Sequence, residues 1–324
     1  MKIRFIYNPC SGKNRRRPWL VPAIHDFIRD SRLLADVVST EGPGHATILA
    51  RAAVREGCRR VVAVGGDGTM NEVAQSLIGA PASLALVPCG SGNGLALHLG
   101  IPTAPLQALA LLADPQSRDV AIDTGSANGH PFFNVMGLGL DAEISRSFNR
   151  LTRRGLAAYI ATGYSTFRRH QPETCIIHGG GRRESLPLSL LAVANSDQYG
   201  NRAYIAPGAS VDDGMLDLVA IGPVGFASAL PLLVRLFLGT IDQSPRVRKL
   251  RDRRFLIERS QRGLIHTDGE THAVGAMIEV GVWPRSLRIT VPKYCRVHAP
   301  LETSAAIEPE EIETLVPTRV HSLP

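Results

Sequence analysis

The chain has 324 residues, of which 44% are hydrophobic and 20% are charged. These values exclude a wholly disordered protein, and the length suggests two domains. Aromatic residues make up only 5%, too few for a protein whose main task is to stack on exposed bases. The formal net charge of +7 favours an anionic partner such as a nucleotide, a nucleic acid or an acidic membrane surface.

The first 125 residues alternate short apolar runs with helical patterns. Strands are predicted over 3–9, 35–40, 59–66 and 83–90, and helices over 20–32, 44–56, 71–78 and 106–113. This alternation is typical of an α/β domain with a parallel sheet, in which ligands gather beyond the carboxyl ends of the strands. Glycine-rich segments follow three of the predicted strands, so we expect a ligand at that edge.

The pattern changes from about residue 127. Short alternating runs separated by glycine and proline predict antiparallel sheets packed as a sandwich, with helices near 156–169 and 226–238. We therefore divide the chain into an α/β nucleotide-binding domain (1–125), a mainly β-sandwich domain (126–300) and a tail (301–324) expected to be poorly ordered. The division leaves open whether the last strand of the sandwich domain returns to the first domain.

Three features of the sequence bear on cellular location. The first residues contain too short an apolar run for a signal peptide, and the apolar stretch 222–240 is interrupted by two prolines and an arginine. Five scattered cysteines without a CxxC pair support neither a zinc site nor a disulfide framework. We expect a soluble, cytoplasmic protein.

The strongest local motif is the run Gly65-Gly66-Asp67-Gly68-Thr69, which joins a β-branched strand to a helix. Its glycines let backbone N–H groups approach a ligand, and the helix N-terminus favours phosphate. Asp67 is a candidate to orient Mg²⁺ through water, and Thr69 to donate to a phosphate oxygen. A tight turn with Thr69 as a helix cap is the alternative.

Two further loops follow the first and fourth predicted strands. They supply small residues, hydroxyls and N–H donors of the kind that bind phosphate: Asn8, Pro9, Ser11 and Gly12 in the first loop, and Gly90, Ser91 and Asn93 in the second. Since parallel strands end at one edge, these loops are expected to converge with the GGDGT run.

These motifs resemble, in order, those of the diacylglycerol kinase catalytic domain family, a superfamily that includes sphingosine and ceramide kinases. The likeness extends over nearly the whole chain. It rests on NPxSG at 8–12, Thr40 with GHA at 44–46, GGDGT at 65–69, GSGN at 90–93, NxxGxGxDA at 134–142, DDGxLD at 212–217 and DGE at 268–270.

The resemblance implies an ATP-dependent kinase that phosphorylates a lipid hydroxyl in a cleft between the two domains. Asp268 would be the general base, Glu270 would support the Mg²⁺ site, and Asp123 would belong to the same Asp–water–Mg²⁺ network. It also implies a structural Mg²⁺ bound by Asp213 and the carbonyls of Ser210 and Met215, although Asp-Asp-Gly is equally good turn chemistry. The expected nucleotide site is completed by Thr40, Asn71 and Glu72.

The second glycine motif departs from the form common in diacylglycerol kinases. An acid that joins the metal network there is replaced here by Gly94, as in some sphingosine kinases, ceramide kinases and bacterial relatives. The missing carboxylate weakens the case for Mg²⁺ and for diacylglycerol as the substrate. Two alternatives stay open. One is an NAD kinase-like enzyme, whose family also carries GGDGT and an Asn-Glu pair, although NPxSG and DGE favour the lipid kinase. The other is a catalytically weakened regulator that binds nucleotide or lipid, which only Gly94 supports.

Arginines gather in two runs, around 146–154 and 246–254. They form either a solvated face or a surface attracted to anionic headgroups, to which the apolar segment 230–238 would add hydrophobic contact. We expect a lipid substrate at an anionic membrane surface, with the protein peripheral to the membrane and ATP and Mg²⁺ as cofactors. No nucleic-acid partner is expected, and a homodimer is compatible with the resemblance.

Overall fold

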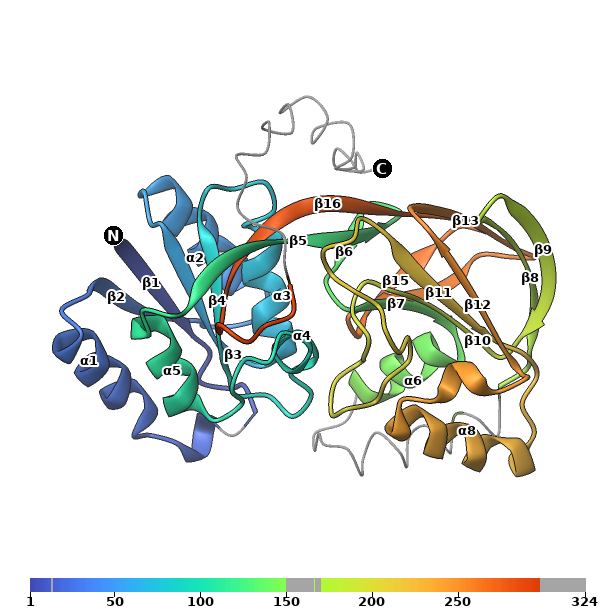
Figure 1. The fold of residues 1–324 in the computed structure, drawn as a ribbon, viewed down its shortest axis with the longest axis horizontal. Helices are drawn as coiled ribbons and strands as arrows, with labels where there is room; N and C mark the ends of the chain where they lie inside the picture. The colour runs from blue at the N-terminus through green and yellow to red at the C-terminus, as the bar shows by residue number, and fades with distance from the viewer. Residues whose placement is uncertain (13, 150–165, 167–169, 298–324) are drawn as a thin grey trace, which may run out of the picture.

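The computed structural model describes residues 1–12, 14–149, 166 and 170–297 of the chain (Figure 1). It contains an α/β domain followed by a β-sandwich domain, which confirms the predicted fold class. The two lie side by side, and two long strands run from one into the other. None of the helices described is both long enough and apolar enough to cross a bilayer.

The first domain is built on parallel strands in the order β2-β1-β3-β4. Its elements are β1 (Lys2–Tyr7), η1 (Asn14–Arg16), α1 (Leu20–Asp30), β2 (Leu34–Ser39), α2 (His45–Arg55), β3 (Arg60–Gly65), α3 (Asp67–Gln75), β4 (Ser83–Pro88), α4 (Gly94–His98) and α5 (Pro105–Ala113).

Both faces of this sheet are covered by helices, so its central strands are apolar without alternation. On β3, Val61 and Ala63 belong to the core formed with α2 and α3, whereas Val62 and Val64 belong to the core formed with α1 and α5. Burial on both faces explains the continuous β-branched run in this part of the sequence.

The second domain consists of two packed sheets. Its elements are β5 (Arg118–Ala127), β6 (His130–Phe132), β7 (Val135–Gly139), α6 (Leu140–Asn149), β8 (Glu173–Gly179), β9 (Arg182–Leu188), β10 (Leu190–Ala194), β11 (Leu216–Ile221), α8 (Phe226–Leu238), η2 (Ile241–Gln243), β12 (Val247–Asp252), β13 (Arg254–Arg259), β14 (Gly263–Thr267), β15 (Glu270–Val274) and β16 (Met277–Val291).

One sheet has six antiparallel strands in the order β12-β11-β10-β7-β14-β15. The other continues the sheet of the first domain, because β16 pairs with β4 near one end and with β13 near the other. Alternate residues of the two sheets, such as Leu138 on β7 and Ile257 on β13, meet in a shared apolar core. Helix α8 covers the other face of the six-stranded sheet.

Two local predictions need correction, and one lies outside the described residues. Helix α3 starts at Asp67 instead of Asn71, so the end of the GGDGT run is its first turn. A short helix, α4, starts at Gly94 and was not predicted. The helix expected near 156–169 falls almost wholly outside the described residues.

Candidate functional site

Three loops meet at the carboxyl ends of β1, β3 and β4, which are neighbours in the parallel sheet. The backbone N–H of Gly66, after β3, donates to Oγ of Ser11, after β1, at 2.6 Å. The side chain of Asn8 donates to Oγ1 of Thr69 at 2.9 Å. The loops that carry the sequence motifs are therefore in direct contact.

Glycine is required where these loops touch. A Cβ on Gly12, whose φ is +53°, would lie 1.9 Å from the carbonyl oxygen of Cys89. A Cβ on Gly90 would lie 2.7 Å from Cα of Gly66, so these two loops pack backbone against backbone. Gly68, in contrast, is exposed in the first turn of α3. Its open backbone at a helix N-terminus is suited to an anionic ligand.

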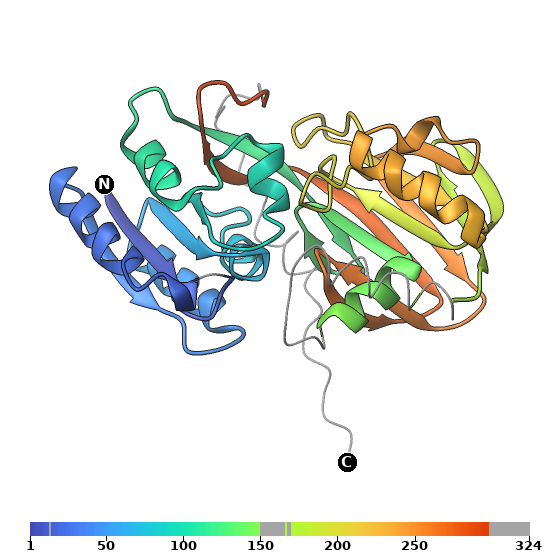
Figure 2. The same cartoon turned by 90° about the horizontal axis from the view of Figure 1, so that it is seen from below.

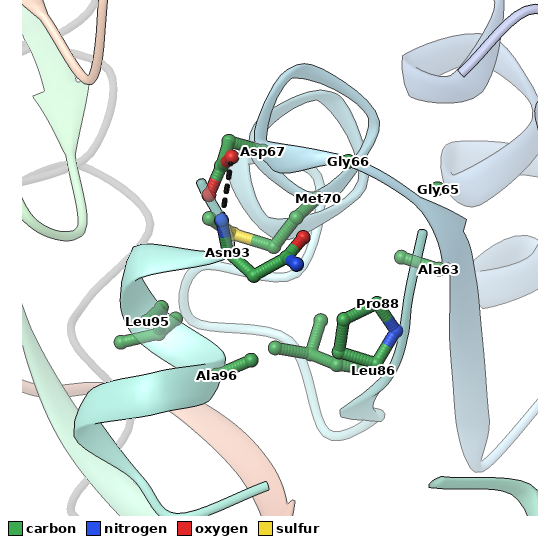
Figure 3. A pocket seen from close by; sticks show the side chains of 10 residues that line it. All are labelled: Ala63, Gly65, Gly66, Asp67, Met70, Leu86, Pro88, Asn93, Leu95 and Ala96. Carbon is green, nitrogen blue, oxygen red and sulfur yellow. Dashed lines mark hydrogen bonds between the residues drawn. The ribbon is translucent and has the colours of Figure 1, made fainter. Parts of the chain in front are cut away.

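Asp67 is the first residue of α3, and its carboxylate points to the loop after β4 (Figure 3). Its oxygens accept the N–H groups of Asn93 at 2.9 Å and of Gly94 at 3.0 Å. Burial raises the pKa of Asp67, and these hydrogen bonds offset part of the increase. The cavity lined by these residues has a volume of about 20 Å³, room for about one water, so a nucleotide has to bind outside it.

The resemblance implies a magnesium ion that arrives with ATP, and this edge offers it one carboxylate. Mg²⁺ keeps several waters and is usually bound by one or two carboxylates together with substrate phosphates. That carboxylate is Asp67, whose oxygens already accept two backbone N–H groups. Within the described part of the chain, acidic, histidine and cysteine side chains form no group of three that could hold a metal by themselves. Asp67 is therefore the residue suited to a water-mediated contact with the ion.

Glu72, expected at the nucleotide site, has an internal role. Its carboxylate accepts the N–H groups of Gly44 at 2.9 Å and Ala46 at 3.0 Å, at the start of α2. Carboxylates stabilise a helix N-terminus by binding its free N–H groups and by interacting with the helix dipole. Glu72 thus caps α2 and fixes it against α3.

Other members of the predicted nucleotide set differ in exposure. Thr40, Thr69 and Asn71 are buried, and Oδ1 of Asn71 has no hydrogen-bond partner among the described residues. Asn93 closes its own loop, accepting the N–H of Gly90 and donating to the carbonyl of the same residue, both at 3.1 Å. Seven are at least partly exposed along this edge: Asn8, Pro9, Ser11, Gly12, Gly90, Ser91 and Asn93.

The carboxylate of Asp268 is bound by backbone N–H groups just before and at the start of β7. Its Oδ2 accepts from Phe133 at 2.7 Å, and its Oδ1 accepts from Asn134 and Val135, both at 2.9 Å. The φ of Asp268 is +49°, a left-handed conformation that is strained for most residues and recurs at functional sites. Burial raises the pKa of Asp268 to about 6, and the three hydrogen bonds oppose this increase.

Glu270 is exposed at the start of β15. Its charge acts on His130, which stacks on His272 with ring centroids 3.8 Å apart. Burial lowers the pKa of both imidazoles, that of His272 to about 4, so the stack is neutral at pH 7. Glu270 therefore lies beside a neutral histidine pair, and its support of Mg²⁺ stays a prediction.

The second domain contacts the glycine loop after β4. The N–H of Asn201 donates to the carbonyl of Gly92 at 3.1 Å, and a Cβ on Gly200 would lie 3.0 Å from the carbonyl carbon of Gly92. Nearby, Nδ1 of His98 lies 2.8 Å from Oδ1 of Asp197. Loop 197–201 thus packs on the loop after β4, at the edge of the first domain where phosphate is expected to bind.

Asn134 connects the two candidate acids. Its N–H binds Asp268, and its Oδ1 would lie 3.2 Å from a Cβ on Gly94, whose own N–H binds Asp67. The carbonyl oxygen of Tyr199 would lie 3.0 Å from the same Cβ. Asp67 and Asp268 are therefore separated by only two residues in contact, although they belong to different domains.

A buried polar cluster lies behind the Asp268 turn. The hydroxyl of Tyr199 donates to Oδ2 of Asp141 at 2.5 Å, and Nε2 of His266 lies 3.0 Å from the same oxygen. Nδ1 of His266 accepts the N–H of Gly269 at 3.2 Å, so Nδ1 is the acceptor of this ring in the cluster. Asp141 belongs to a matched sequence motif, but no sequence signal pointed to Tyr199.

Asp123 is fully buried on β5 and contacts the 212–214 turn. Its carboxylate accepts the N–H groups of Gly214 and Arg285, both at 2.7 Å. Burial raises its pKa, and the charge of Asp213 raises it further. The hydrogen bonds of its carboxylate link it to this turn and to β16, whereas those of Asp67 link it to the loop after β4.

The 212–214 turn is held by its own acids. Asp213 accepts the N–H of Met215 at 2.9 Å and forms an ion pair with Arg251. Ser210 donates its hydroxyl to Asp212 at 2.5 Å. Arg251 supplies positive charge where the resemblance assigns a metal ion, so the structural ion at this turn stays a prediction.

Comparisons with known proteins match both domains of the chain. Residues 2–126 match the diacylglycerol kinase catalytic domain, and residues 134–291 match the YegS C-terminal NAD kinase β-sandwich-like domain. A Pseudomonas putida protein named "Probable lipid kinase YegS-like" is 37% identical over 217 residues, covering 65% of this chain and 72% of that protein. A Bacillus subtilis protein named diacylglycerol kinase is 28% identical over 277 residues, covering 83% and 89%.

Solved structures show the same fold. A Bacillus anthracis crystal structure described as a diacylglycerol kinase has a TM-score of 0.67 at 18% identity, covering 90% of this chain and 96% of that one. A second crystal structure from that organism reaches 0.75 at 21% identity, covering 90% and 95%. With both domains matched by family models, the chain belongs to the diacylglycerol kinase catalytic domain family, among whose members are the YegS-like lipid kinases.

Proposed function

We propose that the chain transfers the γ-phosphate of ATP to a hydroxyl of a diacylglycerol-like or sphingoid lipid, with Asp268 as the general base. The observation that carries this proposal is the contact through Asn134, which links the carboxylate of Asp268 to Gly94 and so to Asp67. This contact would bring the base for the acceptor close to the phosphate-binding edge. Relatives named as lipid kinases support a lipid acceptor.

The glycine loops would bind the phosphates through backbone N–H groups and the N-terminus of α3. Asp268 would take the proton of the lipid hydroxyl while that oxygen forms a bond to the γ-phosphorus, and the bond from phosphorus to ADP breaks. Three N–H groups fix the orientation of the carboxylate, and a pKa of about 6 leaves it mostly ionised at pH 7. Mg²⁺ bound with ATP, near Asp67, would neutralise phosphate charge.

The test offers purified protein MgATP labelled in the γ-phosphate, with diacylglycerol, monoacylglycerol, sphingosine or ceramide in mixed micelles, and NAD in parallel. The variant Asp268→Asn removes the base, and Asp30→Asn, which changes an exposed acid at the end of α1, is the control. We expect one lipid to be labelled, with a loss of at least about 100-fold in Asp268→Asn and none in Asp30→Asn.

Three results would contradict the proposal. Full activity of Asp268→Asn would show that Asp268 is not the general base. Labelling of NAD alone would assign the chain to the NAD kinase-like alternative. ATP binding without transfer to any acceptor would favour the regulator.

A further inference from the structure

Helix α8 is apolar on two opposite faces. Its inner face places Leu232 in the core beneath the six-stranded sheet. On the other side, Leu230, Val234 and Leu238 expose 66%, 50% and 70% of their surface. Residues four apart lie on one helix face, so these three form a stripe about 12 Å long, here called the α8 stripe. A helix that is apolar all round is normally buried all round, but α8 is buried on one side only.

The α8 stripe faces away from the protein. In two perpendicular views, α8 lies on the outer edge of the second domain (Figures 1 and 2). Most other large exposed apolar residues are on separate elements, such as Trp19 before α1, Ile48 on α2 and Leu106 on α5. Single exposed apolar residues are normal, whereas a stripe on one helix marks an interaction surface.

Positive charge borders the α8 stripe. The helix contains no acid, and its single charge is Arg235, whose Nη1 donates to the carbonyl of Thr240 just past the helix end. At the other end, Nη1 of Arg246 donates to the carbonyl of Pro223. Neither arginine forms an ion pair with the part of the chain that the structure describes. Both guanidinium charges are therefore uncompensated by carboxylates there.

A third arginine and one acid complete the border. Arg202 is exposed in the loop whose Tyr204 donates its N–H to the carbonyl of Leu236 on α8, at 2.9 Å. Asp242, on η2, is exposed four residues past the helix. Three arginines against one carboxylate give this face a net positive charge that complements an anionic surface.

We propose that the α8 stripe docks the protein on an anionic lipid bilayer, with Leu230, Val234 and Leu238 in the acyl region and the arginines at the headgroups. Helices that lie in a membrane interface combine an apolar face with basic residues in this way. The inference rests on the proposed function, since a lipid substrate in a membrane requires the enzyme to bind there.

The α8 stripe is connected to the candidate site by a short segment. Tyr204 hydrogen-bonds α8, and five residues earlier Tyr199 hydrogen-bonds Asp141 behind the Asp268 turn. Within the same loop, Asn201 contacts Gly92 at the phosphate-side edge. A bilayer bound at the α8 stripe would therefore lie next to the loop that borders both candidate acids.

The test is co-sedimentation of the full chain, without ATP, with vesicles of phosphatidylcholine or of an equal mixture with phosphatidylglycerol. We expect binding to the mixed vesicles that weakens as NaCl rises from 0.1 to 0.5 M, because salt screens the arginines. In Leu230→Glu/Leu238→Glu the partition coefficient should fall at least about tenfold. The control Leu106→Glu, at another exposed leucine on α5, should change it by less than about twofold.

Several outcomes would overturn the proposal. If the wild-type protein does not bind mixed vesicles, or if the double variant binds them as well as the wild type does, the α8 stripe is not a membrane-docking surface. If sedimentation velocity shows a dimer that the double variant dissociates while vesicle binding is kept, the stripe covers a second copy of the chain instead. Leu230→Gln/Leu238→Gln repeats the test if the glutamates unfold the domain, which circular dichroism detects. The co-sedimentation measures vesicle binding and no turnover. Its result therefore does not depend on whether the kinase assay succeeds or fails.

Discussion

The backbone N–H of Gly94 donates a hydrogen bond to Oδ1 of Asp67 at 3.0 Å, at a point where the two domains touch. A side chain at position 94 would meet the carbonyl oxygen of Tyr199 at 3.0 Å and Oδ1 of Asn134 at 3.2 Å. The space that an acid would occupy is therefore filled by the second domain. The departure from the common diacylglycerol kinase motif thus has a packing explanation.

Placing an acid at position 94 should consequently destabilise this protein. Gly94→Asp would force the domains apart and bury a second carboxylate beside Asp67, so we expect the free energy of unfolding to fall by about 3 kcal/mol. Gly94→Ala adds only the methyl group and should cost about 1 kcal/mol. Urea unfolding measures both values. A Gly94→Asp variant as stable as the wild type, with higher Mg²⁺-dependent activity, would contradict this explanation.

The pKa of Asp268 predicts how activity depends on pH. A general base works only when ionised, and burial raises the pKa of this carboxyl to about 6. We expect kcat/KM for the lipid to rise about tenfold per pH unit below pH 6 and to level off above pH 7. The profile is measured in mixed micelles at constant ionic strength. A flat profile between pH 5 and 7 would show that another group accepts the proton.

The central strands of the first domain could be predicted because they are buried along almost their whole length. Val61–Val64 are buried on both faces of the sheet, and a continuous apolar run between turn residues reports this directly. The convergence of the three glycine loops followed from the same reasoning, since parallel neighbouring strands end at one edge. The start of α3 was missed because Gly66 and Gly68 are typical of a turn and disfavour a helix.

Contacts between distant segments left no such signal. Strand β16 spans both domains, but its pairing with β5 is interrupted between Trp283 and Leu287, where Arg285 has a φ of +50°. This irregularity divides the apolar pattern of β16 into two runs that look like separate strands in the sequence. Similarly, the hydrogen bond from Asn201 to Gly92 depends on domain packing and not on periodicity. Sequence motifs identified the acids, whereas the loop that joins them required the structure.

The hydrogen bonds of Glu72 predict an effect on stability and not on nucleotide affinity. Glu72→Ala removes the acceptor for two N–H groups at the start of α2, and the free energy of unfolding should fall by about 1–2 kcal/mol. The KM for ATP should change by less than about twofold. Glu41→Ala, an exposed acid close to the same helix, is the control and should leave both unchanged. An unchanged stability with a tenfold higher KM would instead place Glu72 at the nucleotide.

The cluster behind Asp268 predicts a difference between two substitutions of His266. Asparagine keeps an acceptor near the position of Nδ1, which binds the N–H of Gly269, whereas glutamine keeps a donor near Nε2, which faces Asp141. If His266 positions the base through Gly269, His266→Asn should retain kcat within about threefold and His266→Gln should lose about tenfold. The KM for ATP should stay unchanged in both, because the glycine loops are untouched. Equal losses in the two variants, at equal thermal stability, would show that the hydrogen bond to Gly269 does not position Asp268.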